Sequence, residues 1–327
     1  MNNYSWIQQK LHQLALSKSF MREVTFDIES SIISTNQFED KHVFVSGLAR
    51  SGTTILLNAL YLSGEFSSLS YRDMPFVLAP NLWSKLSFTK QENKSVERAH
   101  GDGINVSIDS PEAFEEVFWM TFADDKQSTR EKFKTYVDLI NFKYQKKRYI
   151  SKNNQNIKRL DLISCIFPNS KILIPFRNPV QHAHSLLSQH KRFIENSKKD
   201  SFVSDYMKWI GHTEFGSNYS PIHNNNLHFR EHLDINHWIE QWFLTYQKCF
   251  LDLKDNKNIY FICYEELCLS KAYWQDILRI LEINDAYNFE FKESQKNIDF
   301  DIDGVLSGKA FSLYDQLIEF RLFKEER

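Results

Sequence analysis

The chain has 327 residues, which is enough for one large α/β domain with a buried core or for two small domains. It carries 40 Lys plus Arg against 42 Asp plus Glu, a net charge of -2, so its charge gives no general attraction to nucleic acid or to an anionic membrane. Any anion site must therefore be local. The four cysteines have neither a metal-ligand spacing nor the density of a disulfide scaffold, which favours a reducing compartment and hence a cytoplasmic protein.

Residues 1–40 are expected to form an N-terminal helical extension. Gln, Lys and His interrupt the first twenty residues before any apolar run reaches the length of a signal peptide or a membrane span. No Pro/Gly/Ser linker divides the remainder, so 41–327 is predicted to be a single domain. A polar stretch over 211–226 and a helix over 235–253 belong to a helical and loop insertion expected around 195–255.

Short apolar runs alternate with helix-like segments along the chain. The run 42–46 is followed by Gly47 and by a helical pattern that begins at Thr54, and further apolar runs cover 171–176 and 258–263. This alternation predicts an α/β fold with a parallel β-sheet flanked by helices. The run Ser110-Pro111-Glu112 predicts the start of another helix, because it supplies an N-cap, a first-turn proline and an early acid.

The segment from Gly47 to Thr54 has the glycine spacing of a phosphate loop, G-x-x-x-x-G, between a predicted strand and a predicted helix. Backbone N–H groups and a helix N-terminus in such a loop favour an anion. The lysine of nucleoside triphosphatases is replaced by Thr53, and a cation comes earlier, at Arg50. The strand 171–176 leads to Arg177 instead of a magnesium-binding aspartate, so no metal is expected. The alternative is a glycine turn that binds no ligand.

Two segments in this order resemble the donor site of sulfotransferases that use 3′-phosphoadenosine 5′-phosphosulfate (PAPS). The first is Arg50-Ser51-Gly52-Thr53-Thr54, which resembles the loop that holds the 5′-phosphosulfate. The second is Phe176-Arg177-Asn178-Pro179-Val180 with Ser185 beyond it, which resembles the element that binds the 3′-phosphate. The resemblance is strongest to the branch with tyrosylprotein and bacterial sulfotransferases. It implies a P-loop NTPase-like fold, PAPS as donor and adenosine 3′,5′-bisphosphate (PAP) as product.

Two weaker matches extend the resemblance towards the C-terminus. Tyr264, in Tyr264-Glu265-Glu266-Leu267, matches a residue near the nucleotide, and Lys309 ends a glycine-containing segment like the one that closes over the nucleotide in many members. The cytosolic branch typically has a lysine in the donor loop and a catalytic histidine downstream. This chain has Arg50 in the loop instead.

Sulfuryl transfer needs cations at the leaving phosphate and a base at the acceptor hydroxyl. Arg50 is the first expected cation, and Lys152 resembles the lysine of a family segment. Asp73 follows Arg50 by 23 residues, close to where the tyrosylprotein branch carries its catalytic glutamate, and is the predicted base. Its alternative role is to cap a turn or helix beside Pro75.

The acceptor is expected to be a hydroxyl of a small molecule or a glycan. Its site is predicted at His100, Asp102, Trp119 and His212, of which His100 and His212 are rival bases and Trp119 lies on a helix with Glu115 and Glu116. Two other functions stay open at this point. One is a phosphoryl-transfer kinase with an atypical phosphate loop, and the other is a silent PAP-binding protein without a base.

Overall fold

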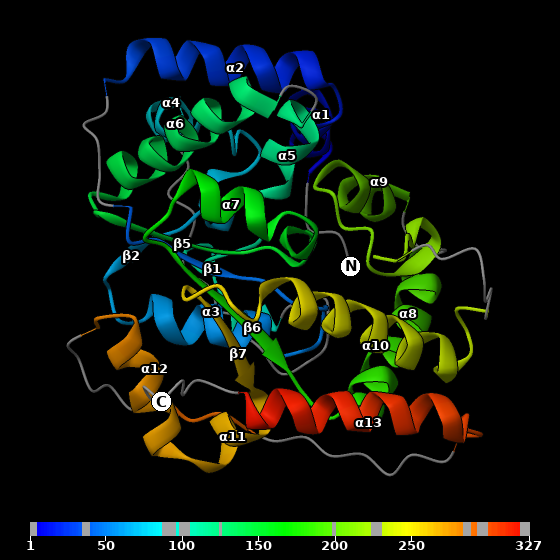
Figure 1. Cartoon of the computed structure of the whole chain (residues 1–327). Coiled ribbons are helices and arrows are strands. Elements are labelled where there is room, and N and C mark those ends of the chain that lie inside the picture. The colour runs from blue at the N-terminus through cyan, green and yellow to red at the C-terminus, as the bar shows by residue number, and fades with distance from the viewer. Residues whose placement is uncertain are drawn as a thin grey trace.

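The computed structural model has an α/β fold whose parallel sheet carries helices on both sides (Figure 1). The residues that it describes are 5–34, 40–86, 96–97, 105–123, 126–197, 201–223, 231–283, 289–292 and 300–320. Among them, five strands form the main sheet in the order β2-β5-β1-β6-β7. The predicted fold class is confirmed.

Each strand of the sheet is short and almost wholly buried, as expected for a sheet covered on both faces. The strands are β1 (Val43–Val45), β2 (Phe66–Ser67), β5 (Arg148–Lys152), β6 (Lys171–Phe176) and β7 (Ile259–Cys263). A separate antiparallel pair consists of β3 (Val96–Glu97) and β4 (Asn105–Val106). The central strand β1 pairs with β5 and with β6, so Val45 lies between Lys152 and Leu173.

Helices connect the parallel strands and cover the sheet. The α-helices are α1 (Trp6–Leu16), α2 (Ser19–Ile32), α3 (Thr53–Tyr61), α4 (Pro80–Leu86), α5 (Glu116–Phe122), α6 (Lys126–Tyr144), α7 (Leu160–Ile166), α8 (Pro179–Ser197), α9 (Ser201–Trp209), α10 (Ile235–Leu253), α11 (Tyr264–Leu269), α12 (Lys271–Ile280) and α13 (Gly304–Glu319). Short 3₁₀ turns are η1 (Tyr71–Asp73), η2 (Asn154–Lys158) and η3 (Gly216–Asn218). In Figure 1, α3 lies to the lower left of the sheet, and α7 and α10 lie to its upper right. None of the described helices is both long and apolar enough to cross a membrane.

Residues 1–40 contain α1 and α2, and buried polar contacts join α2 to α1 and to the rest of the fold. Arg22 donates to the hydroxyl of Thr121 at 2.8 Å and to the Leu16 carbonyl at 2.5 Å. The carboxylate of Glu29, which has no exposed surface, accepts from the Asn81 side chain at 2.7 Å and from the backbone N–H groups at the start of α4. Burial raises the pKa of Glu29, and these hydrogen bonds oppose the rise. The division into an extension and a single domain stays a prediction.

The helix predicted to open at Ser110 begins later, so that prediction is wrong. Pro111 forms an isolated antiparallel bridge with Ser70, and α5 starts only at Glu116. A capping sequence permits a helix start without imposing one. Here, pairing with Ser70 keeps Pro111 in an extended connection.

Candidate active site

The phosphate loop follows β1 at the carboxyl edge of the sheet and leads directly into α3. Arg50 has a φ of 69° and Gly52 a φ of 101°, both in the left-handed region, so the chain turns sharply before α3 starts at Thr53. A Cβ on Gly52 would lie 2.4 Å from the Tyr264 ring. Glycine at 52 therefore lets the loop adopt its turn and lets Tyr264 pack against it.

The predicted 3′-phosphate element follows β6 at the same edge. Asn178 caps α8 by accepting from the N–H groups of Val180 and Gln181, both at 3.1 Å, and Pro179 takes the first helical position. This cap starts the helix just beyond the strand, which leaves Arg177 at the junction between them. The guanidinium of Arg177 lies 5.6 Å from the centre of the Tyr264 ring.

The two predicted donor elements meet in space. Nε of Arg50 donates to the hydroxyl of Ser185 at 3.2 Å, although 135 residues separate them in sequence. Arg50 belongs to the loop after β1, and Ser185 lies on α8 after β6. Three strand ends thus bring Arg50, Arg177 and Tyr264 to one edge of a parallel sheet, where ligands of such folds bind.

His182 supports the phosphate loop from α8. Its Nε2 lies 2.8 Å from the carbonyl oxygen of Ala49, and because a carbonyl only accepts, Nε2 carries the proton. The side chain is fully buried. Burial lowers the pKa of His182 to about 3, and the positive charge of Arg177 adds to this effect. His182 therefore stays neutral and positions the loop.

Lys152 ends β5 beside the loop and belongs to a buried polar network. Thr53 donates to Asn154 at 3.3 Å, and Asn154 donates to Glu214 at 3.3 Å. Burial alone would raise the pKa of Glu214, but the charges of His212 and Lys152 and the hydrogen bond from His212 lower it to about 2. Glu214 is therefore an anion, stabilised in part by the positive charge of Lys152.

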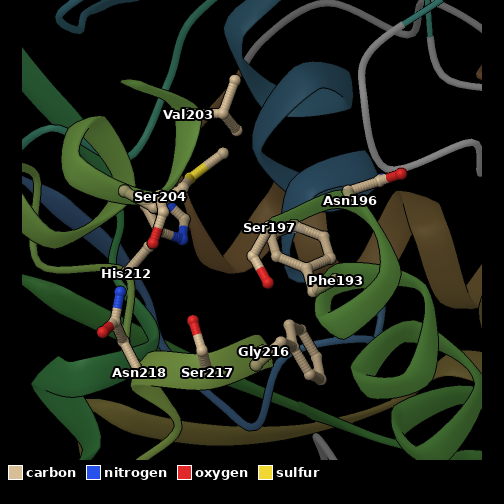
Figure 2. Close-up of a pocket in the computed structure, with 11 residues that line it drawn as sticks. Phe193, Asn196, Ser197, Val203, Ser204, His212, Gly216, Ser217 and Asn218 are labelled. Carbon is tan, nitrogen blue, oxygen red and sulfur yellow. The ribbon is translucent and has the colours of Figure 1, made fainter. Parts of the chain in front are cut away.

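His212 lies at the other end of this network. Its Nδ1 is 3.4 Å from a carboxylate oxygen of Glu214, an ion pair when the imidazole is protonated. In the neutral form, a proton on Nδ1 facing the carboxylate leaves the lone pair on Nε2. His212 also lines a pocket of about 50 Å³ between α8, α9 and η3 (Figure 2).

Asp73 has no exposed surface and is enclosed by its own partners. It accepts from the backbone N–H of Ser70 at 2.7 Å and from the hydroxyl of Tyr144 at 2.6 Å, and it forms an ion pair with Lys143. Ser70 and Asp73 form a capping box around η1. These contacts use both carboxylate oxygens and favour the capping role that the sequence left open.

The remaining predicted site residues lie in different surroundings. Trp119 is 3% exposed, donates to Glu115 at 2.9 Å and lies under the guanidinium of Arg159, so its contacts favour a packing role. Lys309 lies on the exposed side of helix α13, not in a glycine loop. His100 and Asp102 lie outside the described residues. All of these assignments stay predictions.

Comparison with known proteins identifies the family of the chain. The family model described as "Sulfotransferase family" matches residues 42–214, which is more than half of the chain and includes both donor elements. The chain belongs to the sulfotransferase family. No curated protein sequence matches it.

Three solved sulfotransferases resemble the structure at low sequence identity. STF1 from Mycobacterium tuberculosis H37Rv is 12% identical with a TM-score of 0.47, covering 86% of this chain and 78% of its own. STF9 from Mycobacterium avium is 11% identical with a TM-score of 0.45, covering 97% and 79%. The sulfotransferase from Alicyclobacillus acidocaldarius is 14% identical with a TM-score of 0.43, covering 85% and 93%.

Sequence reasoning missed three residues of this candidate site. His182 belongs to no motif in the sequence, and only the folded chain brings it to Ala49. Asn154 and Glu214 were not singled out. The available signal was closeness in sequence, of Asn154 to Lys152 and of Glu214 to His212.

Within the described part of the chain, no group of three or more His, Cys, Asp or Glu side chains could hold a metal ion.

Proposed function

We propose that the chain is a PAPS-dependent O-sulfotransferase. The observation that carries this proposal is the hydrogen bond between Arg50 and Ser185, because it joins the loop expected at the 5′-phosphosulfate to the element expected at the 3′-phosphate. Arg50 and Arg177 would both bind phosphate oxygens, and each presents a planar, permanently charged guanidinium. The 5′-phosphosulfate of the donor would lie against the loop residues Ser51, Gly52, Thr53 and Thr54. Tyr264 would pack against this loop. Lys309 is assigned to nucleotide binding by the resemblance alone.

The transfer itself would need little covalent chemistry from the protein. The acceptor oxygen attacks sulfur, the bond between sulfur and the bridging oxygen breaks, and PAP leaves with the electron pair. Arg50 and Lys152 would stabilise the charge that develops on the leaving phosphate, each contributing about 2–4 kcal/mol in the transition state. No step requires a metal.

Two residues are candidates for the base that takes the acceptor proton. Asp73 was predicted from its position after the loop, but its carboxylate is buried and shared by Lys143, Tyr144 and Ser70. His212 lines a pocket, and Glu214 orients its imidazole. We therefore assign the base to His212 in preference to Asp73.

The four cysteines are free thiols, which supports the proposed cytoplasmic setting.

Thermal unfolding in the presence of nucleotides tests the donor assignment. PAP is expected to stabilise the protein by about 2.7 kcal/mol at a hundredfold excess over its Kd. ATP with magnesium is expected to stabilise it much less, because Arg177 and Ser185 recognise a 3′-phosphate that ATP lacks. Equal stabilisation by ATP at equal concentration would overturn the donor assignment and favour a kinase.

The Arg177→Ala variant separates binding from chemistry. The 3′-phosphate lies away from the bond that breaks, so its contacts should be alike in the ground state and the transition state. We expect Arg177→Ala to weaken PAP binding at least tenfold, while saturating PAPS restores kcat. A large loss of kcat with unchanged PAP affinity would contradict this role.

A further inference from the structure

The first turn of α11 contacts both donor elements. Tyr264 opens this helix, and its ring lies against Gly52 of the phosphate loop and 5.6 Å from the guanidinium of Arg177. The next residue, Glu265, reaches the second element. Its Oε1 accepts from the backbone N–H of Asn178 at 2.8 Å, although 87 residues separate the two in sequence. Two adjacent side chains of α11 thus contact both segments that are expected to bind the donor.

A second contact holds the carboxylate of Glu265 in place. Its other oxygen, Oε2, lies 3.6 Å from Sγ of Cys263, the last residue of β7. Burial raises the pKa of Cys263 to about 12, so this group remains a thiol and donates its proton to the carboxylate. Burial also raises the pKa of Tyr314 on α13, and the nearby charge of Glu265 adds to the rise. The side chain of Glu265 is therefore enclosed by β7, α13 and the start of α8.

Each backbone N–H group at the start of α8 already has an acceptor within the protein. The N–H of Asn178 donates to Glu265, the N–H groups two and three residues later donate to the Asn178 side chain, and Pro179 has no N–H. The helix N-terminus, which could otherwise attract a phosphate, is thus satisfied internally. A 3′-phosphate at this junction would be bound by side chains, so the direction of the Arg177 side chain is decisive.

We propose that Glu265 is a positioning residue of the donor site, which directs the guanidinium of Arg177 towards the 3′-phosphate. The inference rests on the proposed sulfotransferase function and adds a residue to that same site. The N–H of Asn178 belongs to the peptide plane that follows Arg177, so a hydrogen bond to it fixes the backbone from which the arginine side chain extends. Without this hydrogen bond, PAP binding would have to order the junction at a cost in affinity.

The negative charge of Glu265 separates positioning from direct attraction. A carboxylate repels an anionic ligand, so its presence beside a phosphate site requires another role. In Glu265→Gln the amide oxygen can still accept from the Asn178 N–H, and the Kd for PAP should be equal to or below that of the wild type. Glu265→Met keeps the length of the side chain but removes the acceptor, so PAP binding should weaken about tenfold or more. A tenfold loss in Glu265→Gln would overturn the inference.

A double-mutant cycle shows whether Glu265 acts through Arg177. The affinity for PAP is measured by calorimetry in the wild type, Glu265→Met, Arg177→Ala and the double variant. Glu265→Met should weaken binding about tenfold when Arg177 is present, but by less than about threefold when it is already alanine. A general structural role would give the same loss in both backgrounds. That result would also overturn the inference.

Glu266→Met is the matched control, because it makes the same substitution at the next position of α11. Its PAP affinity should stay within about threefold of the wild type, and a loss as large as that of Glu265→Met would contradict the proposed role. Circular dichroism shows whether each variant is folded. If Glu265→Met is not, Glu265→Asp takes its place in the cycle, because its carboxylate is one methylene too short for the same contact. Absence of PAP binding by the wild type would overturn the proposed function, whereas PAP binding with equal losses in both backgrounds overturns this inference alone.

Discussion

Asp73 and His212 are both candidate bases, but they differ in what each side chain already contacts. Asp73→Asn should reduce thermal stability, because the carboxylate pairs with Lys143 in a fully buried position and the amide cannot replace that ion pair. We expect a loss of about 3 kcal/mol in the free energy of unfolding, with PAP affinity and kcat close to wild type. Chemical denaturation, PAP calorimetry and PAPS turnover measure the three quantities.

His212→Gln should have the opposite profile. The amide keeps a polar side chain near Glu214 but cannot take a proton, so kcat should fall about a hundredfold or more while PAP affinity stays within a factor of about three. If Asp73→Asn lost turnover at unchanged stability while His212→Gln kept full kcat, the base would be Asp73. The prediction made from the sequence would then be correct.

His182 supplies a test of loop positioning. His182→Phe keeps an aromatic ring in the buried space but removes the donor to Ala49, leaving a carbonyl without that hydrogen bond at a cost of about 1–3 kcal/mol. His182→Gln can place an amide N–H near the position of Nε2 and serves as the matched control. We expect PAP affinity to fall about tenfold in the first variant and much less in the second. Equal losses in both variants would indicate a packing role only.

At the scale of elements, the turn from β1 into α3 depends on one glycine. In Gly52→Ala, the alanine would have to adopt the left-handed conformation of this position, which costs a residue with a Cβ about 1–2 kcal/mol. Its Cβ would also lie only 2.4 Å from the Tyr264 ring. PAP-induced stabilisation should therefore be lost. The control is Gly64→Ala, which also has a positive φ, 73°, but whose Cβ would meet nothing within 4 Å. If both variants bound PAP equally well, the contact with Tyr264 would not shape the donor site.

The same elements show how far local sequence determines structure. The strand at 171–176 and the helix at 235–253 were predicted with the bounds that they have, because continuous apolar runs and helical periodicity are set by burial. The region around Ser110 was predicted wrongly because Ser70, 41 residues before Pro111 in the chain, pairs with it. Local capping signals contain no information about such a distant partner.

At the scale of the molecule, parallel topology explains why much of the donor site could be predicted. Carboxyl ends of parallel strands lie at one edge, so placing Arg50 and Arg177 after strands already placed them near each other. No comparable rule of topology predicts where the candidate bases lie. His212 reaches the network through a loop between α9 and α10, and Asp73 is enclosed by residues of α6, and neither arrangement follows from sequence spacing.

Three of the histidines whose pKa is lowered by burial depart far enough from the usual value to make stability depend on pH. Burial lowers the pKa of His42 to about 3, of His182 to about 3 and of His190 to about 4, whereas each titrates near 6.5 when unfolded. Between pH 6.5 and about 4 the unfolded chain therefore binds more protons than the folded one. Stability is full above pH 6.5 and falls as the pH decreases through this window.

The loss of stability due to these histidines is opposed mainly by the carboxyl group of Asp138. Each histidine should remove about 2 kcal/mol by pH 5, whereas Asp138, whose pKa burial raises to about 6, should return only about 1 kcal/mol over the same range. We therefore expect Tm to fall by about 5 °C or more between pH 7.5 and pH 5.

His190→Asn is the matched variant. Its side-chain oxygen can still accept from the Gly216 N–H, as Nδ1 of His190 does at 3.3 Å, but the amide does not titrate. Its loss of Tm should be about a third smaller than that of the wild type. An unchanged loss would exclude His190 as a contributor, and a Tm that rises towards pH 5 would show that the carboxyl groups dominate.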